Sequence, residues 1–316
     1  MALRFRPPTA FVGITDGDWF SQLRKLDGLD EVNFWQPSPR GFRALEPGEP
    51  FLFKLHHPRN RIVGVGFFAR HVTLPVSVAW ETFGVKNGVR SLIEMRRRVE
   101  KYRTATSAQP EDYEIGCIML ELPAFFGERD WIEPPLDWKV NIQTGRRYRL
   151  DEEPGRALWQ QVQGLLAKQL STIPGPTLRE PVGPRYGLPV FTLPRLGQGS
   201  FQAAIIDAYA RRCAITGERV LPVLQAAHIK PYGEGGEHRV DNGLLLRSDL
   251  HVLFDRGYVT VSPELDIVVS RRLRDEFNNG DEYMAMTGRK LLMPTRLADR
   301  PNVEFLNWHN QYRFVA

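Results

Sequence analysis

Apolar and polar residues alternate in blocks along the first half of the chain, and the apolar blocks have the lengths of strands. Phe51–Leu55 and Arg61–Phe68 are short apolar runs, and the polar segment His56–Asn60 between them is typical of a connecting turn. The segment Glu46–Pro50 ahead of this pair is a further turn signal. Ile115–Leu122 has the composition of a buried strand. The pattern predicts a β-hairpin and a further buried strand.

Three other segments of this half carry apolar residues at helical spacing. They are Asp18–Leu26, residues 88–104 and residues 154–170. In the second segment, apolar residues fall on one face of the predicted helix and a run of arginines on another. Strands with a few peripheral helices are typical of a small barrel-like α+β domain. We therefore expect an N-terminal domain of the α+β class with a β-barrel and peripheral helices.

The periodic pattern stops between the two halves of the chain. Residues 171–199 contain six prolines and five glycines. Proline fixes φ and cannot donate to a hydrogen-bond ladder, so this stretch is neither a regular helix nor a central strand. It is either an extended linker or an ordered crossing loop packed on both domains. We place the domains at residues 1–175 and 195–316, with residues 176–194 as the linker.

The C-terminal part predicts a strand–loop–strand–helix unit. Leu221–Ile229 is apolar and predicts a strand with His228 at its end, and the glycine-rich run Gly233–Gly236 predicts a flexible loop. The turn Asp241–Gly243 precedes a second apolar run. Ser248 is the expected N-cap of the helix that follows. The order of these elements places one histidine on a strand and further polar residues on a helix.

Four side chains of this unit offer the chemistry of phosphodiester hydrolysis. That reaction needs a base to activate water and a cation to neutralise charge on the phosphate and the leaving oxygen. His228 can supply the base, and the side-chain carbonyl of Asn242 can orient its imidazole. His251 and Asp255 are four residues apart, so both project from one helix face and can hold one divalent ion.

These residues resemble the HNH endonuclease family, in the branch whose first motif reads A-A-H-I-x-P and whose helix reads H-x-x-F-D-x-G. The matching pieces are LQAAHIKP at 224–231, DNGLLL at 241–246, HVLFD at 251–255 and GYVTV at 257–261. RLGQGSF and CAITGE, ahead of them, are similar to the lead-in of the same branch. The resemblance implies a ββα-metal domain from about Arg195 onward. In it His228 is the general base, Asn242 the central Asn, and His251 and Asp255 the metal ligands.

One position departs from the family pattern. Many HNH enzymes have Asp or His immediately before the base as a further metal ligand, whereas this chain has Ala227. Gln225 would face the same side of the strand and could offer a carbonyl oxygen as an extra ligand. Otherwise water and substrate phosphate complete the shell of the expected Mg²⁺ or Mn²⁺. The zinc-binding cysteines of some HNH proteins are absent, so no structural zinc is expected.

The N-terminal segment Asn33–Phe68 is similar to the PUA-like group of domains, which includes the EVE, ASCH and SRA modules. The resemblance rests on FWQPS at 34–38, LEPGEPFLFK at 45–54 and IVGVG at 62–66, in that order. It implies a pocket for a flipped, modified base, which stacks on aromatic rings while polar groups read its edge. The expected stackers are Phe34, Trp35 and Trp80, and the expected edge readers are Asp18 and Gln36. Core packing is the alternative for each aromatic residue.

Charge adds an expected partner. The formal charge is +5 and the pI is near 9.3, and both values favour binding to a polyanionic partner. From Gly199 to the end, basic and acidic residues are equal in number, so the excess lies in residues 1–198. We therefore expect the N-terminal domain to contribute much of the binding affinity for DNA. The expected phosphate contacts are Arg96, Arg97, Arg98, Arg146, Arg147 and Lys230.

Composition narrows the setting. The two cysteines, Cys117 and Cys213, are too few for a disulfide framework, which suits a reducing cytosol. No apolar run approaches the ~20 residues that a membrane-spanning helix needs. The start of the chain lacks the apolar stretch of a signal peptide. We expect a cytoplasmic protein with no membrane partner.

Together the patterns predict a modification-dependent restriction endonuclease, in which an N-terminal reader recognises modified cytosine in double-stranded DNA and a metal-dependent HNH site cuts it. Three alternatives stay open on the sequence. They are an HNH endonuclease of unmodified DNA, a catalytically inactive nucleic-acid-binding protein, and an RNA-directed nuclease, since PUA-like domains also bind RNA. Cleavage of both strands with one site per chain would favour a homodimer.

Overall fold

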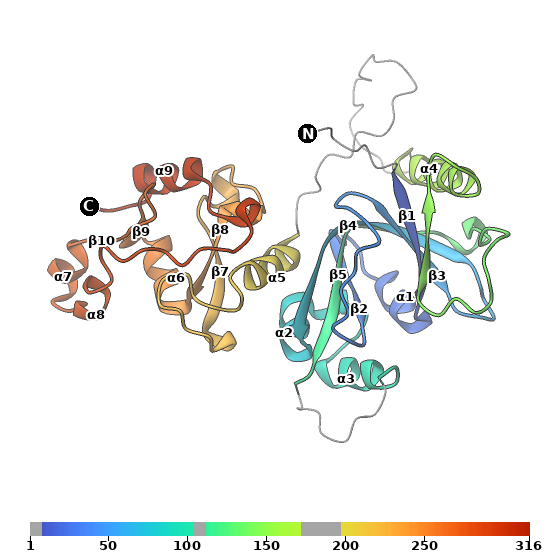
Figure 1. Cartoon of the computed structure of the whole chain (residues 1–316), viewed down its shortest axis with the longest axis horizontal. Helices are drawn as coiled ribbons and strands as arrows, with labels where there is room; N and C mark the ends of the chain where they lie inside the picture. Colours follow the sequence, from blue (N-terminus) through green and yellow to red (C-terminus); the bar gives the residue numbers. More distant parts are fainter. Residues whose placement is uncertain (1–7, 104–111, 172–196) are drawn as a thin grey trace, which may run out of the picture. The chain divides into compact units, whose positions relative to one another are not determined.

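The computed structural model describes residues 8–103, 112–171 and 197–316, and the chain divides into two units, Met1–Pro194 and Arg195–Ala316. Each unit combines helices and strands (Figure 1), which confirms the α+β class. The linker expected at residues 176–194 lies outside the described residues. Among the helices of the described segments, none has the length and apolar character to cross a membrane.

The first unit is built on one six-stranded sheet with the strand order β2-β5-β4-β3-β1-β6. β3 and β4 form the predicted hairpin, β1 pairs with β3 in parallel, and the other neighbours pair antiparallel. The strands are β1 (Thr9–Thr15), β2 (Glu31–Gln36), β3 (Pro50–Leu55), β4 (Ile62–Pro75), β5 (Glu114–Phe125) and β6 (Gly145–Arg149). β4 is longer than its apolar run predicts, because its pairing with β5 continues to Pro75 opposite Glu114.

Alternation along the strands gives this sheet two different faces. Aromatic rings from the sheet and from the first helix pack on one face: Phe11, Trp19, Phe34, Phe51, Phe53 and Phe125. Aliphatic residues on the other face, Ala10, Val12, Leu52 and Val65, pack in one cluster with Leu158 and Val162 of the last helix of the unit. Phe51 and Leu52 are neighbours in the chain and are both fully buried, one on each face. The sheet is therefore the centre of the core.

Side chains cap the starts of the first and third helices of this unit, whereas the second has no side-chain cap. The helices are α1 (Gly17–Leu23), α2 (Val76–Phe83), α3 (Leu92–Glu100) and α4 (Gly155–Ser171). Asp16 caps α1, because its carboxylate accepts from the backbone N–H groups of Asp18 and Trp19 at 2.9 and 3.0 Å. α3 is shorter than the predicted 88–104, because Ser91 caps its first turn and Gly88 ends the preceding 3₁₀ turn in the left-handed region.

The second unit contains the predicted strand–loop–strand–helix order. β7 (Leu224–His228) and β8 (Gly243–Arg247) pair antiparallel, and α6 (Ser248–Asp255) follows directly. α5 (Gln198–Ala208) packs on both strands. The remaining elements are β9 (Val259–Val261), β10 (Ile267–Val269), α7 (Arg272–Phe277), α8 (Asp281–Met284) and α9 (Val303–Tyr312). The ββα arrangement is the expected one.

The start of α6 differs from the prediction. Ser248 is the first helical residue and Arg247 is the N-cap, with no side-chain cap. The Arg247 N–H donates instead to the Sγ of buried Cys213 at 3.4 Å, and the Arg247 guanidinium holds Asp249 in the first turn at 2.7 Å. The guanidinium hydrogen bond lowers the pKa of Asp249, while burial opposes this. The first turn of α6 thus carries an Arg247–Asp249 ion pair in place of a side-chain cap.

One glycine brings α5 onto the two strands. Gly243 begins β8 directly opposite His228 on β7. A Cβ at this position would overlap the side chain of Ile205 and lie 2.8 Å from Phe201 Cζ. The absence of a side chain therefore lets α5 approach closely. This approach carries Phe201 to the histidine at the end of β7.

Candidate active site

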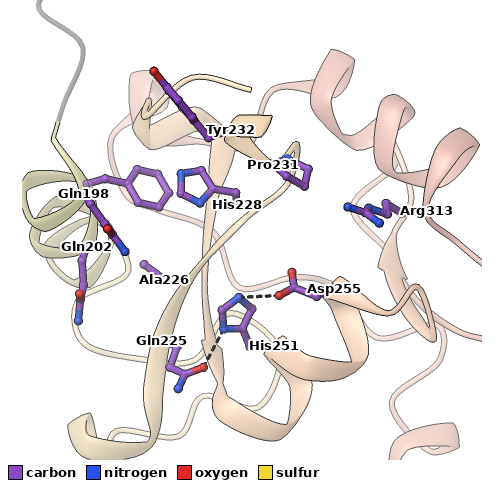
Figure 2. A pocket seen from close by; sticks show the side chains of 11 residues that line it. Gln198, Gln202, Gln225, Ala226, His228, Pro231, Tyr232, His251, Asp255 and Arg313 are labelled. Carbon is purple, nitrogen blue, oxygen red and sulfur yellow. Dashed lines mark hydrogen bonds and ion pairs between the residues drawn. The ribbon is translucent and has the colours of Figure 1, made fainter. Parts of the chain in front are cut away.

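A cavity of about 610 Å³ in the second unit collects the predicted nuclease residues. Figure 2 shows α5 on one side of it, β7 and α6 at the back, and Arg313 on the side opposite α5. Its walls are formed by Gln198, Phe201, Gln202, Gln225, Ala226, His228, Pro231, Tyr232, His251, Asp255 and Arg313. The predicted base and both predicted metal ligands thus line the same space.

His251 and Asp255 face each other across one turn of α6. The distance from His251 Nε2 to Asp255 Oδ2 is 3.3 Å, as expected for side chains at this spacing. The other ring nitrogen of His251, Nδ1, lies 2.7 Å from Gln225 Oε1 (Figure 2). A carbonyl oxygen can only accept, so in the neutral imidazole Nδ1 is the donor and Nε2, which faces Asp255, is the nitrogen with the lone pair. Gln225, predicted as an extra metal ligand, contacts the imidazole of the predicted ligand His251.

This pair fits a divalent ion as two of its ligands. An imidazole nitrogen with a free lone pair and a carboxylate oxygen are donors that Mn²⁺ and Mg²⁺ accept, and both ions commonly keep water or phosphate in their other positions. Ala227, the position of a further acid in many relatives, is fully buried. In the described residues, no group of three or more His, Cys, Asp or Glu side chains comes together for a metal.

His228 is held between two rings. Its imidazole stacks on Phe201, with ring centroids 4.0 Å apart and planes at 11°, and its Nε2 lies 2.9 Å from His238 Nδ1. Burial lowers the pKa of His228 to about 4, and the neighbouring His238 and His251 add to the shift. The imidazole is therefore neutral near pH 7, as a general base must be. The sequence pattern did not single out Phe201 or His238.

The predicted contact between Asn242 and the imidazole of His228 is wrong. Asn242 is fully buried, and its Oδ1 accepts from the backbone N–H of Lys230 at 2.9 Å. Its Nδ2 donates to the carbonyls of Lys230 and Glu237, both at 2.9 Å. Both the oxygen and the nitrogen of the Asn242 amide thus bond to the backbone of the loop that follows β7. The backbone groups of this loop have no partners in a strand ladder, so they need such bonds. Asn242 fixes this loop across the start of β8.

Arg313 is a cavity residue that the sequence motifs did not indicate. It follows α9, and the tail after it docks on the turn behind α6, where the Val315 N–H donates to Gly257 O at 3.0 Å. This docking brings a guanidinium from the end of the chain to the wall opposite α5. Lys230, a predicted phosphate contact, is not on the cavity wall; its Nζ lies 5.6 Å from the ring centroid of Trp308.

A second cavity, of about 850 Å³, lies in the first unit at the end of β2. Phe34, Trp35 and Gln36 line it as predicted, but Asp18 and Trp80 do not. Trp35 is only 9% exposed and its indole N–H donates to Asn87 O at 3.1 Å. Trp35 is thus mainly a core residue with an edge at the cavity.

Other residues of this cavity escaped the sequence analysis because they come from separate segments. They include Asp16, Arg40, Phe42, Arg43, His56 and Tyr102. Burial opposes ionisation of Asp16, but hydrogen bonds from the Trp19 N–H, the Tyr102 hydroxyl and the Asp18 N–H lower its pKa overall. The Tyr102 hydroxyl lies 2.9 Å from Asp16 Oδ2. Asp16 thus lines this cavity, where Asp18 was expected.

The predicted phosphate contacts of this unit fall into two groups. Arg98 is bound to Glu94 at 2.5 Å, Arg146 to Asp137 at 2.7 Å, and Arg96 lies 3.9 Å from Asp112. Arg97 and Arg147 are exposed. The first group already has acidic partners, so its net attraction for a phosphate is reduced. Arg97 and Arg147 are better placed for DNA, together with the exposed Arg40 and Arg43 at the cavity.

Comparison with known proteins bears mainly on the second unit. A family model described as HNH endonuclease matches residues 213–262, the segment that contains β7, β8 and α6. The match confirms the HNH resemblance: the second unit contains an HNH endonuclease domain. No curated protein matches the chain in sequence.

Solved structures with partial similarity were also found. One is ASCH from Zymomonas mobilis, with 13% identity and a TM-score of 0.31, covering 49% of this chain and 94% of that one. Another is described as modification dependent TagI restriction endonuclease, with 13% identity and a TM-score of 0.26, covering 90% of this chain and 76% of that one. ASCH is one of the PUA-like modules that the N-terminal sequence resembles.

Proposed function

We propose that this protein is a metal-dependent DNA endonuclease that cuts DNA carrying a modified base. One observation carries the nuclease part: within the segment that matches the HNH family, His228 and the His251–Asp255 pair line one cavity. A neutral base and a two-donor metal site on adjacent walls are what hydrolysis of a phosphodiester requires.

The roles of the side chains follow from their protonation. Neutral His228 takes a proton from a water molecule, whose oxygen then attacks the phosphorus atom as the bond to the leaving oxygen breaks. A divalent ion held by His251 and Asp255 would supply positive charge for the phosphate and the leaving oxygen. Arg313 faces the same cavity and offers a second, permanent positive charge to the phosphate oxygens. Gln225 keeps the His251 imidazole in the tautomer that a metal needs.

The first unit is the proposed reader. A flipped base needs a cavity of a few hundred Å³ with stacking surfaces and polar groups, and the cavity of about 850 Å³ offers Phe34, Phe42 and Tyr102 as rings. An ionised Asp16 can accept a hydrogen bond from the exocyclic amine of cytosine. This chemistry suits a base with an exocyclic amine, and of these we propose modified cytosine. The positive excess of residues 1–198 supports binding to DNA by this unit.

The test is cleavage of matched duplexes by the full chain with Mg²⁺ or Mn²⁺. The duplexes carry cytosine, 5-methylcytosine, 5-hydroxymethylcytosine or N6-methyladenine at the same positions. We expect cleavage of a modified-cytosine duplex and loss of cleavage in His228→Ala, with DNA binding retained. Equal cleavage of all four duplexes would support an endonuclease that acts on unmodified DNA. Binding without any cleavage would support a catalytically inactive nucleic-acid-binding protein. Each chain has one proposed active site, and cleavage of both strands at one position requires two. We therefore propose that a homodimer cleaves the DNA.

A further inference from the structure

The loop after β7 places a second histidine against the base of the active site. His238 Nδ1 lies 2.9 Å from His228 Nε2, and the two ring centroids are 4.9 Å apart. His238 does not line the cavity, whereas His228 does. His238 therefore contacts the base without lining the space where a phosphate would bind.

Three features fix His238 in this position. Tyr232 stacks on its ring, with centroids 4.8 Å apart and planes at 15°. The residue before it, Glu237, is tied to β8 through the Asn242 Nδ2 hydrogen bond to its carbonyl. Gly236 lets the loop fold tightly, since a Cβ there would clash with the Lys230 carbonyl. The buried asparagine thus acts on His228 through the loop and not by direct contact.

The hydrogen bond between the two imidazoles decides which nitrogen of His228 can act as a base. Both rings have one N–H when neutral, and one proton lies between Nε2 of His228 and Nδ1 of His238. If His228 donates, its own Nδ1 keeps a lone pair. If His238 donates, His228 must carry its proton on Nδ1 and has no lone pair left for water. Within the described residues, His228 Nδ1 makes no hydrogen bond, so it is the atom available to a water molecule.

We infer that His238 is a positioning residue that accepts a hydrogen bond from His228 Nε2 and thereby makes Nδ1 the base. The inference rests on the proposed nuclease function. When water loses its proton to Nδ1, the electron pair of the O–H bond stays on the oxygen that attacks phosphorus. The imidazolium so formed keeps its Nε2–H bond to the neutral acceptor on His238, which stabilises the charge. The titratable groups around His228 are His238 from the loop and His251 from α6.

Two substitutions separate the hydrogen bond from packing. His238→Phe keeps a ring against Tyr232 but has no acceptor. His238→Asn loses the ring, but its amide oxygen is close to the position of Nδ1. We expect His238→Phe to lower kcat by about 10- to 100-fold with little change in KM, the range seen when a partner that orients a functional imidazole is lost. We expect His238→Asn to recover most of this loss. Thermal unfolding of each variant checks that the fold is retained.

A measurement that needs no catalysis accompanies the kinetics. Long-range ¹H–¹⁵N spectra of the full chain report the tautomer of each histidine, and His228→Ala assigns its signals. We expect His228 in the Nε2–H form at pH 7 and a loss of this preference in His238→Phe. His228 in the Nδ1–H form, or His238→Asn no more active than His238→Phe, would overturn the inference. A chain with the expected tautomer but no cleavage of any duplex would overturn the nuclease proposal alone.

Discussion

Gln225 Oε1 accepts a hydrogen bond from His251 Nδ1 at 2.7 Å, which joins the middle of β7 to the middle of α6. The bond does two things at once: it orients the imidazole ring, and it directs the Nε2 lone pair to the side where Asp255 Oδ2 lies 3.3 Å away. The geometry of the proposed two-residue metal site thus depends on a neutral third side chain.

The first prediction follows from this contact. Gln225→Ala removes the acceptor, so the His251 ring can turn and adopt either tautomer. We expect affinity for Mn²⁺ to fall by about 10- to 100-fold, as is common when the hydrogen-bond partner of a histidine ligand is lost. Calorimetric titration of the full chain with Mn²⁺ measures this. Gln202→Ala is the matched control, because Gln202 lines the same cavity from α5. An equal loss in both variants would contradict the role given to Gln225.

The second prediction concerns the ligands themselves. Asp255→Ala and His251→Ala each leave one donor of the pair, so neither variant should bind Mn²⁺ measurably in the same titration. A chelator should stop cleavage by the unaltered chain without lowering its Tm, since the pair lies on the cavity wall and not in the core. Asp281→Ala removes an exposed carboxylate of α8 and should bind Mn²⁺ normally. Unfolding of the domain on chelation would reveal a structural metal and contradict the prediction.

The third prediction tests the tail of the chain. Arg313→Ala removes a guanidinium from the cavity, so charge that builds on the phosphate loses a partner. We expect kcat/KM to fall by about 10²-fold, as for loss of one donor to a developing oxyanion. Arg313→Lys should recover part of the lost kcat/KM, because an ammonium group keeps the positive charge but cannot form the bidentate hydrogen bonds of a guanidinium. Arg256→Ala, an exposed arginine at the end of α6, is the control. Unchanged cleavage by Arg313→Ala would remove this role.

The fourth prediction is a pH dependence of stability. His309 is 2% exposed; it bonds Thr260 Oγ1 at 2.8 Å and Phe254 O at 3.1 Å, and burial lowers its pKa to about 4 from an ordinary 6.5. Above about pH 6.5 the folded and unfolded states are both neutral at this residue, and its contribution is fully present. Between pH 6.5 and pH 4 only the unfolded state takes up the proton. The free energy of unfolding therefore decreases as the pH is lowered through this range.

His309→Phe tests this in urea unfolding at pH 7 and pH 5. The variant keeps a ring to stack on Phe254 but leaves the Thr260 hydroxyl without its His309 partner, whereas the Phe254 carbonyl still accepts from the Gly257 N–H at 2.9 Å. At pH 7 we expect a loss of about 1–3 kcal/mol for the buried hydroxyl left unpaired. The drop in stability between pH 7 and pH 5 should become smaller than in the unaltered chain, with His228 supplying part of the remainder. An unchanged drop would show that His309 is not responsible.

The fifth prediction distinguishes a stacking residue from a core residue in the first unit. Phe42 is half-buried at the cavity, so Phe42→Ala should weaken binding to a modified duplex by about 5- to 150-fold, the worth of one stacked base. Trp35→Ala should instead destabilise the unit by about 3–5 kcal/mol, because the ring is buried. Binding is measured in a His228→Ala background, with an unmodified duplex and Phe277→Ala as controls. A Phe42→Ala protein with full preference for the modified duplex would exclude stacking on this ring.

The sequence alone determined the local order of the nuclease domain. Apolar runs and turn residues gave β7, β8 and α6 in the right sequence, and the four-residue spacing placed His251 and Asp255 on one helix face. These are relations between near neighbours, which backbone geometry fixes regardless of the rest of the fold. For the same reason the β3–β4 hairpin was predictable. Strand β1, which pairs with β3, and strand β6, which pairs with β1, join the sheet over long distances in sequence and were not predicted.

Tertiary structure alone decided the partners of the functional side chains. Asn242 and His228 are close in the motif, but the loop backbone, left without ladder partners, takes the Asn242 amide and brings His238 to His228. Arg313 reaches the active-site cavity because a tail far along the chain docks behind α6. Burial, which sets the low pKa of His228, exists only once α5 has packed over β8 at Gly243. Contacts between distant segments depend on packing of the whole unit, and no local pattern of residues contains that information.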